Sequence, residues 1–175
     1  MGGTCLNSGC IPTKTLKASA EALETALRLA EFGIACDGTP KVDPAALLAR
    51  KEKVMLTLRG GLEKACARLK VRLCNGHGKV LDARHVEVTA SDGHVEVVEN
   101  DALILATGSR VLELPGLPFD HQHILSSDDA LRLDRVPRRL IIVGGGVIGC
   151  EMAFIYRTFG AQVTVVEAQN RLLPM

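Results

Sequence analysis

Two cysteines near the amino terminus have a spacing that suits thiol chemistry. Cys5 and Cys10 lie in the segment GGTCLNSGCIPTK, residues 2–14. A disulfide between them would close a very short loop, which adds only about 2 kcal/mol of loop-closure stabilisation. It would hold no distant segments together, so a redox couple is a better interpretation than a structural bridge. We expect Cys10 at the start of a helix, where the dipole favours a thiolate, and Cys5 in the preceding loop.

The same pair could instead be half of a zinc site. Zinc would need further cysteine or histidine ligands at metal spacing. The five histidines lie far away in the sequence, and His121 and His123 fall in a region that reads as a solvated linker. The spacing therefore favours redox chemistry, and no metal site is predicted. The remaining cysteines are scattered among aliphatic residues, as small buried hydrophobic side chains would be: Cys36, Cys66, Cys74 and Cys150.

A glycine-rich turn near the carboxyl terminus is the second candidate site. It follows the apolar run LIIV, residues 140–143, opens a helical pattern and leads into VTVVE, residues 163–167. Strand, turn, helix and strand form the context that a dinucleotide fingerprint requires, with phosphates at the helix N-terminus. The alternative is a glycine-rich turn without a ligand. Three glycines fit the motif G-x-G-x-x-G: Gly144, Gly146 and Gly149.

Each part of this turn has an expected task. Gly144 allows a tight turn, Gly146 lets backbone amides approach a pyrophosphate, and Gly149 lets the helix pack closely on the strand. Glu167 would accept hydrogen bonds from the ribose 2′-hydroxyl, so NAD is favoured over NADP. The predicted NAD contacts are Gly144, Gly146, Val147, Ile148, Gly149 and Glu167.

Composition sets broad limits on the function. The chain has 175 residues, of which 47% are hydrophobic and 3% aromatic, so it is globular with a mostly aliphatic core. Its net charge of +1 does not indicate binding to nucleic acid or to a membrane surface. No apolar run reaches the roughly 18 residues of a membrane span, and no secretory signal precedes the first motif. We expect a soluble, cytoplasmic protein without nucleic-acid or membrane partners.

Two long helices and several short strands are expected to position these sites. Apolar residues recur at helical spacing from Pro12, which suits a first helical position, to Gly33. A second helix is expected from Asp43, as N-cap, to about Leu69, forming an antiparallel pair with the first. Residues 71–99 predict short strands in a small β-meander with a turn at Ser91-Asp92-Gly93.

The predicted fold class is α/β. The run ALILA, residues 102–106, is typical of a fully buried strand. Residues 1–112 are predicted to form one domain, and 113–134 a linker that ends in a short helix at 128–133. Residues 135–175 would begin a nucleotide-binding domain.

Four segments in succession resemble the flavin-dependent pyridine nucleotide–disulfide oxidoreductases, and most of all the dihydrolipoamide dehydrogenases. They are GGTCLNSGCIPTK, LCNGHGKV, ALILATGS, and LIIVGGGVIGCEMA with VTVVE. The resemblance covers essentially the whole chain in the family's order and spacing. It implies a flavoprotein with two Rossmann domains, one for FAD and one for NAD.

The resemblance also implies roles for individual residues. Cys5 would be the interchange thiol that forms a mixed disulfide with a dithiol substrate, and Cys10 the flavin-side thiol. Lys14, one helical turn after Cys10, would lie beside the flavin. It would pair with Glu151, which would contact the cofactors as a carboxylate facing the flavin–nicotinamide region. The alternatives are a solvated lysine and an acid that complements a helix dipole. The implied FAD contacts are Gly3, Thr4, Lys14, Gly78, Thr107, Gly108 and Ser109.

The implied reaction is oxidation of dihydrolipoamide by NAD⁺. Electrons would pass from a dihydrolipoyl group to the Cys5–Cys10 disulfide, then to FAD and finally to NAD⁺. The implied partners are a lipoyl-bearing acyltransferase or free dihydrolipoamide, and the full-length protein would be a homodimer.

Two elements of the family are not found in this sequence. They are the first glycine fingerprint, for the FAD pyrophosphate, and the carboxy-terminal dimerisation domain with its catalytic His-Glu pair. No histidine here is therefore assigned as the base, and we expect a fragment that is inactive alone and binds no FAD stoichiometrically. Mercuric and glutathione reductases share the thiol segment, although Glu167 argues against an NADP-linked glutathione enzyme. A non-catalytic zinc or redox-sensing site is the remaining alternative.

Overall fold

The computed structural model describes residues 1–132 and 134–173, so predicted ranges that reach residues 133, 174 and 175 extend outside the described part. The chain forms two compact units, one from residues 1–59 with 110–175 and one from residues 60–109. The predicted domain boundaries at residues 112 and 134 stay a prediction.

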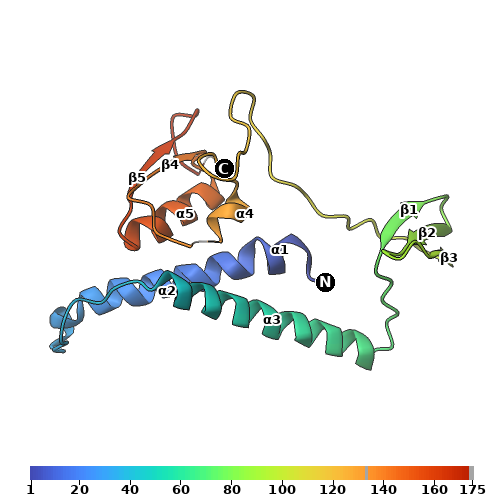
Figure 1. Cartoon of the computed structure of the whole chain (residues 1–175), viewed down its shortest axis with the longest axis horizontal. Helices are drawn as coiled ribbons and strands as arrows, with labels where there is room; N and C mark the ends of the chain where they lie inside the picture. Colours follow the sequence, from blue (N-terminus) through green and yellow to red (C-terminus); the bar gives the residue numbers. More distant parts are fainter. Residues whose placement is uncertain (133, 174–175) are drawn as a thin grey trace. The chain divides into compact units, whose positions relative to one another are not determined.

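The amino-terminal half is helical, as the apolar periodicity predicts (Figure 1). Asp43 caps the third helix, because its Oδ1 accepts a hydrogen bond from the Ala46 amide at 3.1 Å. Gly33 ends the first helical run with a left-handed φ of 71°. The elements are α1 (Gly3–Asn7), α2 (Cys10–Leu27), the 3₁₀ helix η1 (Leu29–Phe32) and α3 (Pro44–Arg68).

Two details at the amino terminus differ from the prediction. Cys5 lies within the short helix α1 rather than in a loop. Pro12 is the third residue of α2 instead of the first. The whole first turn of a helix has amides without intrahelical partners, so proline is tolerated at any position there.

Helices α2 and α3 run antiparallel, which confirms the predicted pair (Figure 1). Arg50 of α3 donates to the Thr15 carbonyl at 2.9 Å, and Arg59 donates to Asn7 Oδ1 at 2.7 Å. The later residue of α3, Arg59, thus contacts the earlier residue, Asn7, as expected for segments that run in opposite directions. Some apolar side chains of α3 are nevertheless exposed, since Leu58 is 42% and Leu62 43% accessible.

The main core lies between α2 and the later helix α5 (Val147–Thr158). Leu16 and Ile155 are each 1% exposed. Burying an aliphatic side chain of this size contributes roughly 1.5–3 kcal/mol. The core residues are Leu16, Ala20, Leu131, Met152, Ile155, Tyr156, Phe159 and Ala161. The thiol helix and the glycine-turn helix are therefore fixed against one another within one unit.

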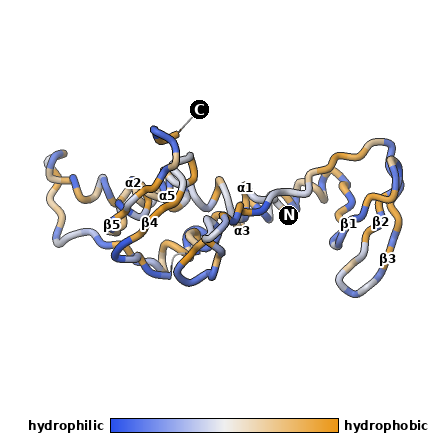
Figure 2. Tube along the Cα trace, turned by 90° about the horizontal axis from the view of Figure 1, so that it is seen from above, coloured by the Kyte–Doolittle hydropathy of each residue, from blue (hydrophilic) through white to orange (hydrophobic). Residues whose placement is uncertain are grey.

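Strands β4 (Arg139–Val143) and β5 (Gln162–Val166) flank α5 in sequence and pair in parallel. Their register runs from Arg139 opposite Gln162 to Val143 opposite Val166. Both strands alternate between exposed and half-buried residues, and apolar residues recur along them in the hydropathy-coloured trace (Figure 2). This is the predicted strand–turn–helix–strand unit.

The second unit contains the predicted β-meander. Its strands β1 (His77–Val80), β2 (His85–Thr89) and β3 (Val95–Glu99) pair antiparallel in that order. Residues 71–74 and 102–106, all described, form no strand, which contradicts the prediction. Ile104 in the second segment is 87% exposed. A buried strand needs hydrogen-bonding neighbours, and no strand among the described residues pairs with residues 102–106.

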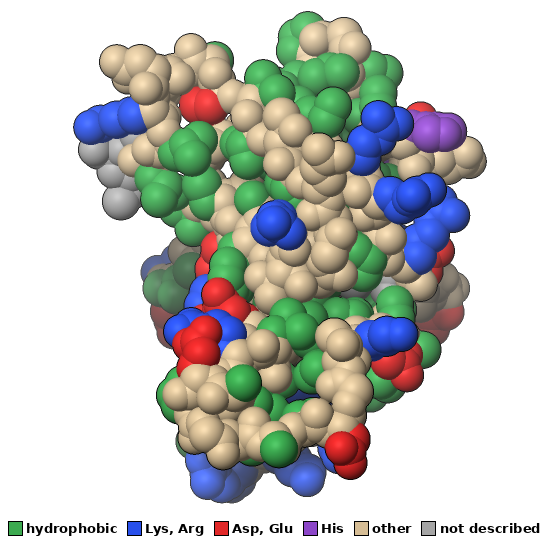
Figure 3. Space-filling model, turned by 90° about the vertical axis from the view of Figure 1, so that its left-hand side faces the viewer, with side chains coloured by type: hydrophobic (Ala, Val, Ile, Leu, Met, Phe, Trp, Pro, Cys, Tyr) green, Lys and Arg blue, Asp and Glu red, His purple; other side chains and the backbone are tan. Residues whose placement is uncertain are grey.

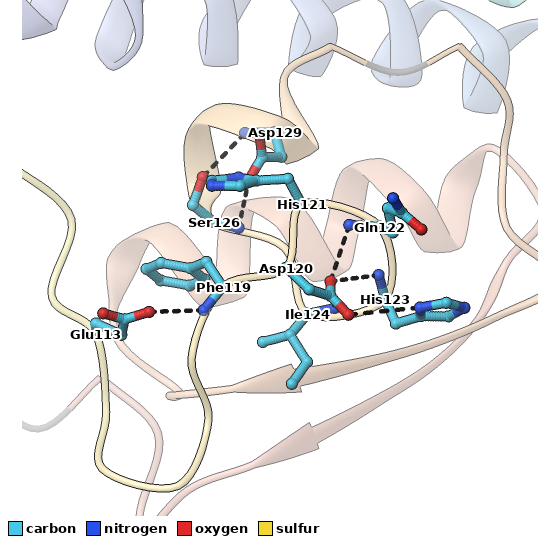
Figure 4. A network of polar contacts seen from close by, with 9 residues as sticks. All are labelled: Glu113, Phe119, Asp120, His121, Gln122, His123, Ile124, Ser126 and Asp129. Carbon is cyan, nitrogen blue, oxygen red and sulfur yellow. Dashed lines mark hydrogen bonds and ion pairs between the residues drawn. The ribbon is translucent and has the colours of Figure 1, made fainter.

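The predicted linker is held by side chains rather than by regular structure (Figure 4). The Asp120 carboxylate accepts hydrogen bonds from the amides of Gln122, His123 and Ile124 at 2.7–2.9 Å, which lowers the pKa of Asp120. Within the linker the structure has the short helix α4 (Ser127–Ala130), which begins earlier than predicted.

Helix α4 is anchored at both ends. At its start Ser126 and Asp129 form a capping box, and His121 Nδ1 lies 2.9 Å from Asp129 Oδ2. Burial opposes ionisation of Asp129, but the bonds from Ser126 and His121 outweigh it and lower the pKa of Asp129 to about 2. At the other end, Lys51 Nζ donates to the Leu131 carbonyl at 2.7 Å. Tyr156 Oη donates to the Ala130 carbonyl, also at 2.7 Å.

Candidate functional site

The two thiols lie together at the junction of α1 and α2. Cys10 is the first residue of α2, as predicted, and both cysteines are exposed free thiols. A hydrogen bond with the Cys10 side chain raises the pKa of Cys5, while the positive charge of Lys14 opposes that rise. The two thiols are therefore near enough to influence each other's ionisation, and both are open to a substrate.

Gly9 permits this close approach and was not singled out from the sequence. A Cβ at this position would lie 2.9 Å from the Thr4 carbonyl oxygen and 3.3 Å from Cys5 Cα. Its backbone angles, φ −132° and ψ −112°, fall outside the regions that other residues favour. The signal available in the sequence was the glycine directly before Cys10.

The cysteines outside the pair differ from one another. Cys36 and Cys74 are exposed, which contradicts their prediction as buried hydrophobic side chains. Cys66 and Cys150 are half-buried, and the Cys150 thiol donates to the Gly145 carbonyl at 3.3 Å.

Lys14 and Glu151 form the predicted ion pair. Lys14 Nζ lies 2.7 Å from Glu151 Oε1 and 2.8 Å from Oε2. Lys14 follows Cys10 by four residues and so shares its face of α2, and Glu151 lies in the first half of α5. The pair joins the thiol segment to the helix that follows the glycine turn, across 137 residues of sequence.

The glycine turn is tightly packed at one glycine and open at another. Gly144 has a φ of 106°, which glycine adopts without strain. A Cβ on Gly149 would overlap the Gly144 carbonyl oxygen, so helix and turn pack too closely for any side chain there. A Cβ on Gly146, by contrast, would meet nothing within 4 Å. That open space lies directly before the first amides of α5, at Val147 and Ile148.

Glu167 closes the turn from the end of β5. Its Oε2 accepts a hydrogen bond from the Gly145 amide at 2.6 Å, and its Oε1 accepts one from the Gln169 amide at 2.8 Å. The bonds from Gln169 and Gly145 lower the pKa of Glu167. The carboxylate is thus ionised beside the turn.

The residues expected at FAD are divided between the two units. Gly3 and Thr4 belong to α1, next to Cys5, whereas Gly78 belongs to β1. Residues 107–109 follow the meander, and Gly108 has a left-handed φ of 84°. Their roles toward FAD stay predictions.

Residues 1–132 and 134–173 contain neither a metal-binding cluster nor a helix that could span a membrane. No cluster of three or more His, Cys, Asp and Glu side chains there is arranged to hold a metal ion. No helix in that part of the chain is long and apolar enough to cross a membrane.

Apolar and basic side chains are interspersed on the face shown in Figure 3. An open groove of about 490 Å³ lies near the end of α2, between Leu23, Leu27 and Phe159. It is built at the opposite end of α2 from the thiol pair, and we assign it no role.

The candidate site combines a thiol pair at a helix start with a glycine turn, and the Lys14–Glu151 ion pair links the two segments. The chain matches the pyridine nucleotide-disulphide oxidoreductase family over residues 1–175. The chain therefore belongs to this family.

Its relatives include several dihydrolipoyl dehydrogenases. The chain is 43% identical over 174 residues to the enzyme of Vibrio cholerae and 40% identical over 173 residues to the mitochondrial enzyme of Dictyostelium discoideum. These alignments cover 99% and 98% of this chain but only 36% and 35% of the relatives. The chain thus spans about a third of the length of the relatives it matches.

Solved structures support the same fold. LpdA from Mycobacterium tuberculosis superimposes with a TM-score of 0.90 at 29% identity, covering 100% of this chain and 38% of that one. The flavoprotein disulfide reductase RclA from Escherichia coli gives a TM-score of 0.79 at 27% identity, covering 99% and 35%. The predicted α/β flavoprotein architecture is confirmed at this level.

Proposed function

We propose that this chain supplies the redox thiols and the NAD-binding turn of an enzyme that oxidises dihydrolipoamide with NAD⁺. The observation that supports the proposal is the Lys14–Glu151 ion pair, because it links the thiol segment to the helix that follows the glycine turn. The names of the similar proteins from Vibrio cholerae and Dictyostelium discoideum favour a lipoyl dithiol over the substrates of other family branches.

The thiols have separate tasks in this proposal. Cys5 lies in α1 and is exposed, so its sulfur exchanges with the incoming dithiol and forms the mixed disulfide. Cys10 starts α2 one turn before Lys14, so it faces the ion pair and passes electrons onward. The Lys14 ammonium supplies a fixed positive charge beside this path, and Glu151 holds it in place.

The residues of the glycine turn fit NAD. The open space at Gly146, next to the N-terminus of α5, suits a pyrophosphate. The absence of a side chain at Gly149 lets the helix pack tightly against the turn. Glu167 offers a carboxylate to the ribose hydroxyls, and its charge repels the extra phosphate of NADP. Bound FAD would supply the hydride-transfer chemistry between the thiols and NAD, with Gly3, Thr4 and residues 107–109 as its proposed contacts.

The partners and location belong to the same proposal. A lipoyl-bearing acyltransferase or free dihydrolipoamide would be the electron donor, a homodimer the assembled form and the cytoplasm the site of action. A glutathione- or mercury-directed enzyme of the same family would share the thiol segment but not the preference for dihydrolipoamide.

The test is an activity assay on the full gene product that contains these residues. Dihydrolipoamide-dependent NADH formation should be lost in Cys5→Ser and in Cys10→Ser. It should persist in Cys36→Ser, which replaces an exposed thiol outside the pair. Retained activity in Cys5→Ser, or turnover with glutathione disulfide and NADPH instead, would contradict the proposal.

A further inference from the structure

Helix α1, which carries Cys5, is linked to α3 through the amide side chain of Asn7. Arg59 Nη2 donates to Asn7 Oδ1 at 2.7 Å. Asn7 Nδ2 donates in turn to the Met1 carbonyl at 3.0 Å and to the Gly3 carbonyl at 2.9 Å. The Asn7 carbonyl oxygen therefore bonds to α3, while its amide nitrogen bonds to the backbone at the start of α1.

Helix α1 depends on this support because it is short and poorly capped. It has five residues, and its N-cap, Gly2, offers no side-chain hydrogen bond. Isolated helices shorter than about 12 residues are marginal in water. Leu6 is its buried residue. The bond from Arg59 thus supplies order that local sequence does not.

Arg59 in turn depends on Asn7. Its Nε is buried and has no hydrogen-bond partner among the described residues. Loss of Asn7 would therefore leave a second donor of the same guanidinium unsatisfied. The loss of either residue would therefore leave the other without this hydrogen bond.

We propose that Asn7 and Arg59 are positioning residues for the thiol pair. Neither residue is placed at a sulfur atom; they act through the backbone of α1, which presents Cys5 to Cys10. This inference rests on the proposed function only in taking the pair as the redox couple.

The rate at which the two thiols close to a disulfide measures their alignment directly. With oxidised glutathione as oxidant, one thiolate attacks a glutathione sulfur and releases one reduced glutathione. The other cysteine then displaces the second, so two electrons pass from the protein to the oxidant. Trypsin leaves both cysteines in one peptide that ends at Lys14, because no Lys or Arg lies between them. Mass spectrometry reads closure in this peptide as the loss of two hydrogen atoms.

We expect Arg59→Met and Asn7→Ala each to slow closure about fivefold, which corresponds to one hydrogen bond of ordinary strength. The double variant should be no slower than the slower single variant, because both act through one contact. Arg59→Lys keeps a donor and should recover part of the rate. Arg50→Met is the matched control, since Arg50 ties α3 to α2 without touching α1.

Unchanged closure in Arg59→Met and Asn7→Ala, with helical circular dichroism retained, would overturn the proposal. Equal slowing in Arg50→Met would also overturn it, because the effect would then be general loosening. If Arg59→Met does not fold, Asn7→Asp decides, since it keeps the acceptor for Arg59 but loses the donors to α1. Slow closure in Asn7→Asp supports the proposal, and unchanged closure overturns it. The assay uses neither flavin nor NAD, so its outcome is independent of the activity test above.

Discussion

Lys14 and Glu151 meet across 137 residues of sequence, with the ammonium group 2.7 and 2.8 Å from the two carboxylate oxygens. Helix α2 brings the lysine from the thiol segment, and α5 brings the glutamate from the glycine turn. The contact is possible because Leu16 and Ile155 are buried in the core that packs these two helices together.

This ion pair should add little to stability. The Lys14 side chain is 56% exposed, so solvent screening limits the pair to less than about 1 kcal/mol. We expect Glu151→Gln to lower the free energy of unfolding in urea by no more than Glu21→Gln, which breaks a surface pair on α2. A loss of several kcal/mol would show that the contact is mainly structural.

Two glycines of the turn should respond differently to alanine. Gly149→Ala forces a Cβ into the Gly144 carbonyl, so we expect a large loss of thermal stability. Gly146→Ala meets open space and a φ of −73°, so the chain should fold normally. Its new methyl group would occupy the proposed phosphate position, and calorimetric titration should show weakened NAD binding. Full NAD binding by Gly146→Ala would argue against a phosphate at this turn.

Glu167 should make stability depend on pH. Bonds from the Gln169 and Gly145 amides lower its pKa in the folded state below the unfolded value of about 4.3. Its contribution is therefore fully present above about pH 4.3 and is lost as the pH falls through the folded pKa. The difference in unfolding free energy between the unmodified chain and Glu167→Gln should shrink from pH 7 to pH 3. A difference that stays constant over this range would contradict the assignment.

Gly9 and Gly60 offer a matched comparison of two helix-associated glycines. Gly9→Ala would push against Thr4 and Cys5, so we expect slower closure of the Cys5–Cys10 disulfide and lower stability. Gly60 lies within α3 with open space at its Cβ position, so Gly60→Ala should raise the unfolding free energy by about 0.5–1 kcal/mol. Normal closure in Gly9→Ala would exclude a role for Gly9 in bringing the thiols together.

Much of the fold could be predicted because the relevant signals lie in contiguous residues. The meander at residues 77–99 follows from alternating apolar and polar side chains and a turn. The start of α3 follows from Asp43, which caps the helix by accepting a hydrogen bond from the Ala46 amide. The prediction failed where non-local partners decide. Residues 102–106 have the composition of a buried strand, yet they lack a neighbouring strand in the described chain and stay exposed. Helix α1 was missed because it has only five residues and one of its contacts is with Arg59, far along the chain.

The sequence by itself determined the chemistry on offer: a thiol pair at a helix start and a glycine turn followed by a carboxylate. These are short motifs, and the few residues of each carry their own backbone and electrostatic requirements. Only the tertiary structure decided how they are combined. Core packing of α2 on α5 brings Lys14 to Glu151, and α3 reaches back to hold the helix of Cys5. Such contacts depend on the distances between elements, which the burial of side chains fixes only when the chain folds.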